Sequence, residues 1–149
     1  MCRNGDTVAA SVVGKGTSVA IELKILAWSC VLLLVHIFAA GHFKTKQYGP
    51  KWNMGARDET LPPLEPVAGR LVRAQANFLE TYPIAIVALL GVVLAGRTSD
   101  LTAIGGWIWL GARIVYLPLY AFGVPVVRTL VYMVGLIGLV LVLQALIAG

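Results

Sequence analysis

The sequence predicts an all-α membrane protein whose fold is a four-transmembrane-helix bundle. Hydrophobic residues make up 58% of the 149 residues and charged residues only 13%, whereas about a quarter of the residues in soluble domains are charged. The mean hydropathy is +0.83. Four apolar stretches each approach the roughly 20 residues that a helix needs to cross a bilayer. Helices are expected because backbone polar groups inside hydrocarbon must be hydrogen-bonded within the protein.

The apolar stretches also set the expected boundaries of the elements. The first 20 residues are rich in Gly, Ser, Thr and Ala and are expected to form a mobile tail, followed by one membrane domain at 21–149. A cleaved signal peptide ending near IFAAG is the alternative, although its apolar run is long for such a signal. The expected helices lie at about 21–43, 68–96, 101–122 and 124–148, and a polar loop lies at 44–67.

The basic residues predict how the chain is oriented. Lys44, Lys46, Lys51 and Arg57 all fall in the polar loop, and basic residues in short loops mark the cytoplasmic side of a membrane. We therefore expect the loop in the cytoplasm and both termini outside. The protein is expected to be a multi-pass protein of the bacterial inner membrane, in contact with membrane lipids.

Polar residues recur at spacings of three and four within three of the predicted helices. Residues at these spacings lie on one face of a helix. Each face combines an arginine with side chains that can hydrogen-bond. The members are Arg73, Asn77 and Glu80 in the second helix, Arg113, Tyr116 and Tyr120 in the third, and Arg128 and Tyr132 in the fourth.

Charged groups inside a membrane must face protein or a watery cavity, because exposing them to acyl chains costs several kcal/mol. Glu80 alone cannot neutralise Arg73, Arg113 and Arg128, so these faces carry a surplus of positive charge. One interpretation is structural, with Glu80 and Arg113 forming an ion pair between two helices. The other is a pocket for a small, flexible anion, since guanidinium groups bind carboxylates with two parallel hydrogen bonds.

Three motifs carry a resemblance to a known family. RAQANFLETYP at 73–83, GARIVYLPLY at 111–120 and VVRTLVY at 126–132 follow one another on successive helices. In this order they resemble the MAPEG family, the membrane-associated proteins in eicosanoid and glutathione metabolism. The chain looks like a bacterial-type member similar to the microsomal glutathione transferases.

This resemblance implies a homotrimer that binds glutathione as a cosubstrate between neighbouring subunits, near the cytoplasmic face. It implies that Arg128 holds the thiolate of glutathione. Glu80 is suited to the amino group of the ligand, and Tyr132 is expected to form part of the pocket wall. The other implied glutathione contacts are Arg73, Asn77, Arg113, Tyr116 and Tyr120.

The chemistry expected at Arg128 is activation of a thiol. A thiol of the cysteine type has a pKa of about 8.5, and a fixed guanidinium beside it favours the nucleophilic anion. The start of a helix adds to the same effect, and Thr129 could donate a hydrogen bond to sulfur. The reaction would be conjugation of a lipophilic electrophile or reduction of a lipid hydroperoxide, with the second substrate arriving from the membrane.

Two other classes of function remain open on sequence alone. A proton-coupled exporter would depend on Glu80, but the arginines disfavour binding of cations. A non-catalytic assembly or lipid-binding protein would use the polar faces only to join subunits. A metal site is not expected, because His36 and His42 lie apart from any cysteine or carboxylate cluster. Nucleic acid is not an expected partner, since topology and the pocket account for the net charge of +5.

Overall fold

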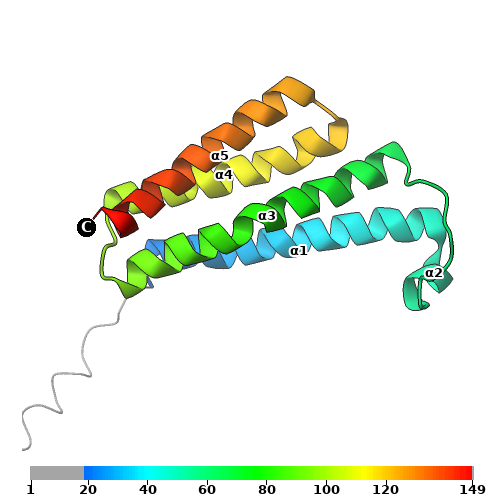
Figure 1. Cartoon of the computed structure of the whole chain (residues 1–149), viewed down its shortest axis with the longest axis horizontal. Coiled ribbons are helices and arrows are strands. Elements are labelled where there is room, and N and C mark those ends of the chain that lie inside the picture. Colours follow the sequence, from blue (N-terminus) through cyan, green and yellow to red (C-terminus); the bar gives the residue numbers. More distant parts are fainter. Residues whose placement is uncertain (1–18, 149) are drawn as a thin grey trace, which may run out of the picture.

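The computed structural model describes residues 19–148, so most of the predicted tail lies outside the described residues. Four helices in this part are long and apolar enough to span a membrane, which confirms the predicted all-helical bundle. Figure 1 shows α1 beside α3 and α4 beside α5, with successive long helices running in opposite directions. The elements are α1 at Ile21–Tyr48, α2 at Pro50–Met54, α3 at Pro66–Leu94, α4 at Asp100–Phe122 and α5 at Pro125–Ile147.

The segment between the first two spanning helices contains more helix than the sequence predicted. The expected loop at 44–67 includes the last turn of α1, which continues to Tyr48, and the short helix α2. Gly49 separates the two with a φ of 90°, a conformation that suits glycine. Gln47 and Tyr48 then donate hydrogen bonds to the carbonyls of Pro63 and Pro62, so the end of α1 holds the returning chain.

The other connections are tight turns with local sequence causes. Gly123 ends α4 in the left-handed conformation, with φ 76° and ψ 28°. Its N–H bonds to the carbonyl of Tyr120 and the N–H of Val124 bonds to that of Leu119, the pattern of a Schellman turn. At the opposite end of α4, Ser99 and Thr102 form a reciprocal capping box.

At the end of the bundle where α1 and α4 begin, a buried acidic side chain that was not predicted as a contact holds the two helices together. Glu22 in the first turn of α1 is only 2% exposed. It accepts a 2.6 Å hydrogen bond from the hydroxyl of Thr102 at the start of α4. A carboxylate removed from water needs such a partner, so this contact fixes α1 against α4.

Aromatic side chains fill the centre of the core. The ring of Phe78 lies 5.1 Å from that of Tyr82 and 6.2 Å from that of Trp109, measured between centroids. His36 packs against Phe78 from α1, at 4.8 Å. These rings join α1, α3 and α4 through dispersion and the offset packing that aromatic pairs favour.

The antiparallel order brings all three predicted polar faces to one end of the bundle. This end carries α2 and the α4–α5 turn, and we call it the α2 end (Figure 1). The first half of α3, the second half of α4 and the start of α5 all lie there. The spacing in the sequence and the up-and-down topology together therefore place the three arginine-bearing segments at similar depth.

Helices α4 and α5 approach until their backbones touch. A Cβ atom on Gly138 would lie 2.6 Å from the carbonyl oxygen of Gly105 and 2.9 Å from the backbone nitrogen of Trp109. Because both atoms belong to backbone, no side-chain rotation could relieve the overlap. Small residues allow this close approach, which is a common basis of helix association in membranes.

We expect Gly138→Ala to lower the melting temperature of the detergent-purified protein, because α4 and α5 must separate to admit the methyl group. A cost of about 1–3 kcal/mol is typical of such overpacking. Tryptophan fluorescence during heating would measure the change. The matched control is Gly111→Ala in α4, where an added Cβ meets nothing within 4 Å. Equal melting temperatures for the two variants would contradict the backbone contact.

Candidate functional site

The predicted site is centred on Arg113, which α4 carries into the interior of the bundle. Its side chain is only 2% exposed. One guanidinium nitrogen donates to the side-chain oxygen of Asn77 at 2.9 Å, and another donates to the hydroxyl of Thr81 at 2.6 Å. Both acceptors come from α3 and are four residues apart, so they present two oxygens from one helix face. Arg113 therefore joins α3 to α4 at the α2 end.

Two tyrosine rings also lie against the same guanidinium group. The central carbon of Arg113 lies 4.9 Å from the ring centroid of Tyr132 in α5 and 5.6 Å from that of Tyr116 in α4. The faces of aromatic rings attract cations, more strongly when water is excluded. Arg113 thus contacts three helices. Among the described residues, its Nε has no hydrogen-bond partner, so a polar donor remains available inside the bundle.

Arg128 occupies a similar environment one layer closer to the α4–α5 turn. Its guanidinium carbon lies 4.3 Å from the ring centroid of Tyr120. Tyr116 packs against Tyr120 at 5.4 Å and against Tyr132 at 6.0 Å. The two arginines are therefore connected through a continuous set of aromatic contacts. We call Asn77, Thr81, Arg113, Tyr116, Tyr120, Arg128 and Tyr132 the arginine–tyrosine cluster.

Arg73 and Glu80 lie differently, on the exposed surface of α3. A guanidinium nitrogen of Arg73 sits near the backbone of Gly69, one turn earlier, where an added Cβ would lie 3.3 Å from it. The hydrogen bonds of Arg113 go to Asn77 and Thr81 rather than to Glu80. The structure thus gives Arg113 uncharged partners where the structural interpretation expected an ion pair, and leaves Glu80 facing outward.

Thr129 is also exposed, and its hydroxyl donates to the carbonyl of Pro125 in the preceding turn at 3.2 Å. In this bond the hydroxyl proton of Thr129 is donated to Pro125, whereas the sequence suggested that it could be donated to the sulfur of a ligand. A role for Thr129 at the thiol would require rotation of its side chain.

Thr81 was not among the predicted site residues, and His36 was considered only as a metal ligand. Thr81 is 6% exposed and His36 1% exposed. A signal for Thr81 was present, because it follows Asn77 by four residues on the same helix face. The Nδ1–H of His36 donates to the carbonyl of Leu32 at 2.9 Å, because a carbonyl oxygen can only accept. Its Nε2 is buried and has no hydrogen-bond partner among the described residues.

None of the predicted site residues lines the four pockets described here within residues 19–148. The largest of these, of about 590 Å³, is formed by α1, α2 and the segments next to them. Two grooves follow the apolar outer faces of α1, α4 and α5, and a smaller pocket lies at the end opposite α2. Within one chain, Arg113 is therefore enclosed, while Arg128 is half-buried and Arg73 and Glu80 are exposed.

The model of the MAPEG family matches residues 25–148, which covers all four spanning helices. This chain belongs to the MAPEG family. The family includes glutathione transferases and related enzymes, generally uses glutathione, and its members are often oligomers. As a MAPEG protein with four candidate spanning helices, the chain is an integral multi-pass membrane protein. Searches among curated proteins and among solved structures gave no match.

In this MAPEG chain we expect Thr81→Val to destabilise the fold, because it removes an acceptor from a buried guanidinium while keeping the shape of the side chain. The expected loss is about 1–3 kcal/mol, the typical cost of leaving a buried polar group unsatisfied. Thermal unfolding in detergent would measure it. Thr81→Ser retains the hydroxyl and should stay closer to the wild type. If Thr81→Ser were as unstable as Thr81→Val, the methyl group rather than the hydrogen bond would be responsible.

Proposed function

We propose that this protein is a glutathione-dependent enzyme that acts on lipophilic substrates, as a transferase, a hydroperoxide reductase or both. The observation that carries the proposal is the arginine–tyrosine cluster, which gathers two guanidinium groups from α4 and α5 at one end of a MAPEG bundle. A cluster with a surplus of positive charge favours an anionic ligand over the cations that an exporter would carry.

The distribution of polar groups suits the parts of glutathione. The ligand has two carboxylates, one ammonium group and one thiol. Arg73 on the exposed edge of α3 is available for a carboxylate, and guanidinium groups bind carboxylates in a fixed orientation. Glu80, on the same edge, offers the opposite charge for the ammonium group. Because the only acidic side chain of this set is Glu80, the ammonium end of glutathione has one place to bind, and this fixes the orientation of the ligand.

Arg128 is the residue that we assign to the thiol. It is half-buried, and its guanidinium rests on the ring of Tyr120, which restricts its orientation. It also lies in the first turn of α5, which begins at Pro125, where unpaired backbone N–H groups create a positive potential. Both features favour the thiolate over the thiol, and the thiolate is the nucleophile.

Two reactions follow from a thiolate at the membrane boundary. In conjugation, sulfur attacks an electrophilic carbon, a C–S bond forms, and the displaced group leaves with the electron pair. In reduction, sulfur attacks a hydroperoxide oxygen and the O–O bond breaks to give an alcohol and oxidised sulfur. A second glutathione then forms the disulfide, with loss of water. Both need a lipophilic partner delivered from the bilayer.

Neighbouring subunits would complete the site. Arg73 and Glu80 are exposed in one chain, while Arg113 is enclosed by its own α3, α4 and α5. A charged edge beside apolar surface is unstable in lipid, so another surface must cover it. In the homotrimer that we propose, the arginine–tyrosine cluster of one subunit lies against the exposed α3 edge of the next, and glutathione binds between them.

We expect Arg128→Ala to reduce the fraction of bound glutathione that is ionised, because the nearby positive charge is lost. The thiolate has an ultraviolet absorbance that can be followed as glutathione is added and as pH is varied. The midpoint of this titration should move upward, and stability should change little since Arg128 is only partly buried. Arg97→Ala, at the opposite end of the bundle, is the matched control. An unchanged midpoint in a variant that still binds glutathione would remove Arg128 from this role.

We expect Glu80→Gln to weaken glutathione binding by roughly tenfold, the effect of losing about 1.4 kcal/mol from a charged hydrogen bond. Isothermal titration of the detergent-purified protein would measure it. An analogue of glutathione without the amino group should bind the wild type and Glu80→Gln with similar affinity. In each protein, the affinity for the analogue is compared with the affinity for glutathione. If removing the amino group weakened binding by the same factor in the wild type and in Glu80→Gln, Glu80 would not contact the amino group. Absence of glutathione binding to the wild type would favour a non-catalytic assembly role.

A further inference from the structure

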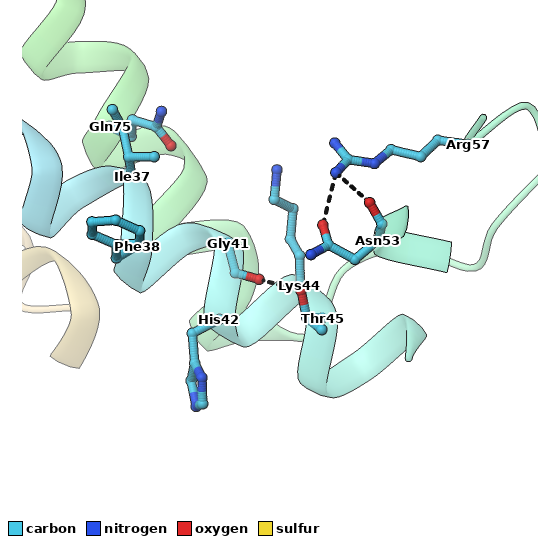
Figure 2. A pocket seen from close by; sticks show the side chains of 9 residues that line it. All are labelled: Ile37, Phe38, Gly41, His42, Lys44, Thr45, Asn53, Arg57 and Gln75. Atoms are coloured by element: carbon cyan, nitrogen blue, oxygen red, sulfur yellow. Dashed lines mark hydrogen bonds between the residues drawn. The ribbon is translucent and has the colours of Figure 1, made fainter. Parts of the chain in front are cut away.

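A small pocket lies at the end of the bundle where α1 and α4 begin, opposite the α2 end. Its volume is about 250 Å³. It shares no residue with the larger pocket at the α2 end that Figure 2 shows, and the arginine–tyrosine cluster also lies at that other end. The first turn of α1, the first turn of α4 and the link before α4 form its wall. Its chemistry is therefore independent of the proposed glutathione site.

The buried carboxylate of Glu22 is part of this wall. Its Oε1 accepts the hydrogen bond from the Thr102 hydroxyl, but its Oε2 has no hydrogen-bond partner within residues 19–148. The same hydroxyl lies 2.8 Å from the carbonyl oxygen of Ser99, so one proton is shared between two acceptors. A carboxylate with so little contact with water needs further donors or a cation to keep its charge. Oε2 is thus an acceptor that a ligand in the pocket can reach.

A second carboxylate, that of Asp100 in the first turn of α4, lines the same pocket. Carboxylates at helix starts often serve only to bind free backbone N–H groups. Here other acceptors take these groups. The N–H of Leu23 bonds to the carbonyl of Ala20, and the N–H of Thr102 bonds to the side chain of Ser99. Two carboxylates from two helices therefore border one space without acting as these caps.

The wall of this pocket has no basic side chain among the described residues. Lys24 and Arg97 are the basic residues nearest to it in sequence. Lys24 is exposed and follows Glu22 by two residues, so it leaves α1 in a different direction. Arg97 donates to the carbonyl of Ala145 in α5 at 3.4 Å. The pocket is therefore negatively charged, and a cationic ligand fits it.

Oxygen ligands of this kind are those that Mg²⁺ and Ca²⁺ prefer. Residues 19–148 contain no group of three or more His, Cys, Asp or Glu side chains that could hold a metal ion, so water has to complete the coordination. Mg²⁺ commonly keeps several water molecules while one or two carboxylates bind it.

We propose that this pocket binds a hydrated divalent cation, Mg²⁺ or Ca²⁺, through Oε2 of Glu22 and the carboxylate of Asp100. The hydroxyl groups of Thr98 and Ser99, which also belong to the wall, are available to the water molecules of the ion. The bound ion joins the first turn of α1 to the first turn of α4 and adds to the contact between Glu22 and Thr102. Two carboxylates give a weak site, with a dissociation constant on the order of 0.1–1 mM.

The test follows the melting temperature of the full-length protein in a non-ionic detergent, after a chelator has removed divalent ions. MgCl₂ or CaCl₂ should raise the melting temperature to a plateau, because an ion that binds only the folded state stabilises it. NaCl at equal ionic strength should not. Glu22→Gln and Asp100→Asn should each require about tenfold more of the ion or lose the response. Asp58→Asn/Glu59→Gln is the control, since it removes two exposed carboxylates outside the pocket. It should respond like the wild type.

A second measurement does not depend on stability. Mn²⁺ binds the same oxygen ligands as Mg²⁺, and the electron paramagnetic resonance signal of free Mn²⁺ falls when the ion binds. The wild type should bind about one Mn²⁺ per chain, and added Mg²⁺ should displace it. Asp100→Asn should bind much less. This variant leaves the contact between Glu22 and Thr102 intact, so it serves if Glu22→Gln does not fold.

Four results would overturn the proposal. An equal response of the wild type, Glu22→Gln and Asp100→Asn would show that the ions act elsewhere. An equal effect of NaCl would show that ionic strength alone is responsible. Absence of any response in the wild type would leave the two carboxylates with a structural role only. Stabilisation by ethanolamine at lower concentration than by either ion would assign the pocket to an ammonium group. Glutathione binding, at the opposite end of the bundle, should be unchanged in these variants.

Discussion

The arrangement of this bundle depends on burying the guanidinium group of Arg113 within a membrane. A charge at that depth is tolerated only with close partners, and three helices contribute them. Asn77 and Thr81 supply oxygen atoms from α3, while Tyr116 and Tyr132 supply ring faces from α4 and α5. The requirement fixes the rotation of each helix about its axis, because a turn of one residue would remove a partner. The polar residues that define the candidate site are therefore also the residues that hold the helices in register.

Much of this could be predicted from the sequence because membrane proteins obey two strong regularities. Apolar length sets the number of spans, and polar residues at helical spacing reveal which faces point inward. The faces containing Asn77, Arg113, Tyr116 and Tyr132 were predicted in this way, and the structure brings these four side chains together. What the sequence could not give was the choice of partner. Glu80 carries the charge opposite to that of Arg113, yet Arg113 binds the buried hydroxyl of Thr81 instead. The direction in which each side chain leaves α3 therefore decides the partner more than its charge does.

Contacts between distant segments were the other part beyond the reach of sequence patterns. The bond from Thr102 to Glu22 spans 80 residues, and no periodicity links the two. The short helix α2 escaped detection because a polar segment of five helical residues is too brief to show a repeat. The fixed position of Arg57 likewise depends on Asn53 and on a backbone angle that no composition reveals. These local features give the α2 end its shape, and they lie outside the motifs that identify the family.

The turn at Gly123 and Val124 has a consequence for how the charged side chains are shielded. With so short a link, α4 and α5 form one antiparallel helical hairpin. That hairpin carries Arg113 and Arg128 together with the rings of Tyr116, Tyr120 and Tyr132 that lie against them. The hairpin thus provides the aromatic partners of both arginines by itself, and only the hydrogen-bond acceptors of Arg113 have to come from α3.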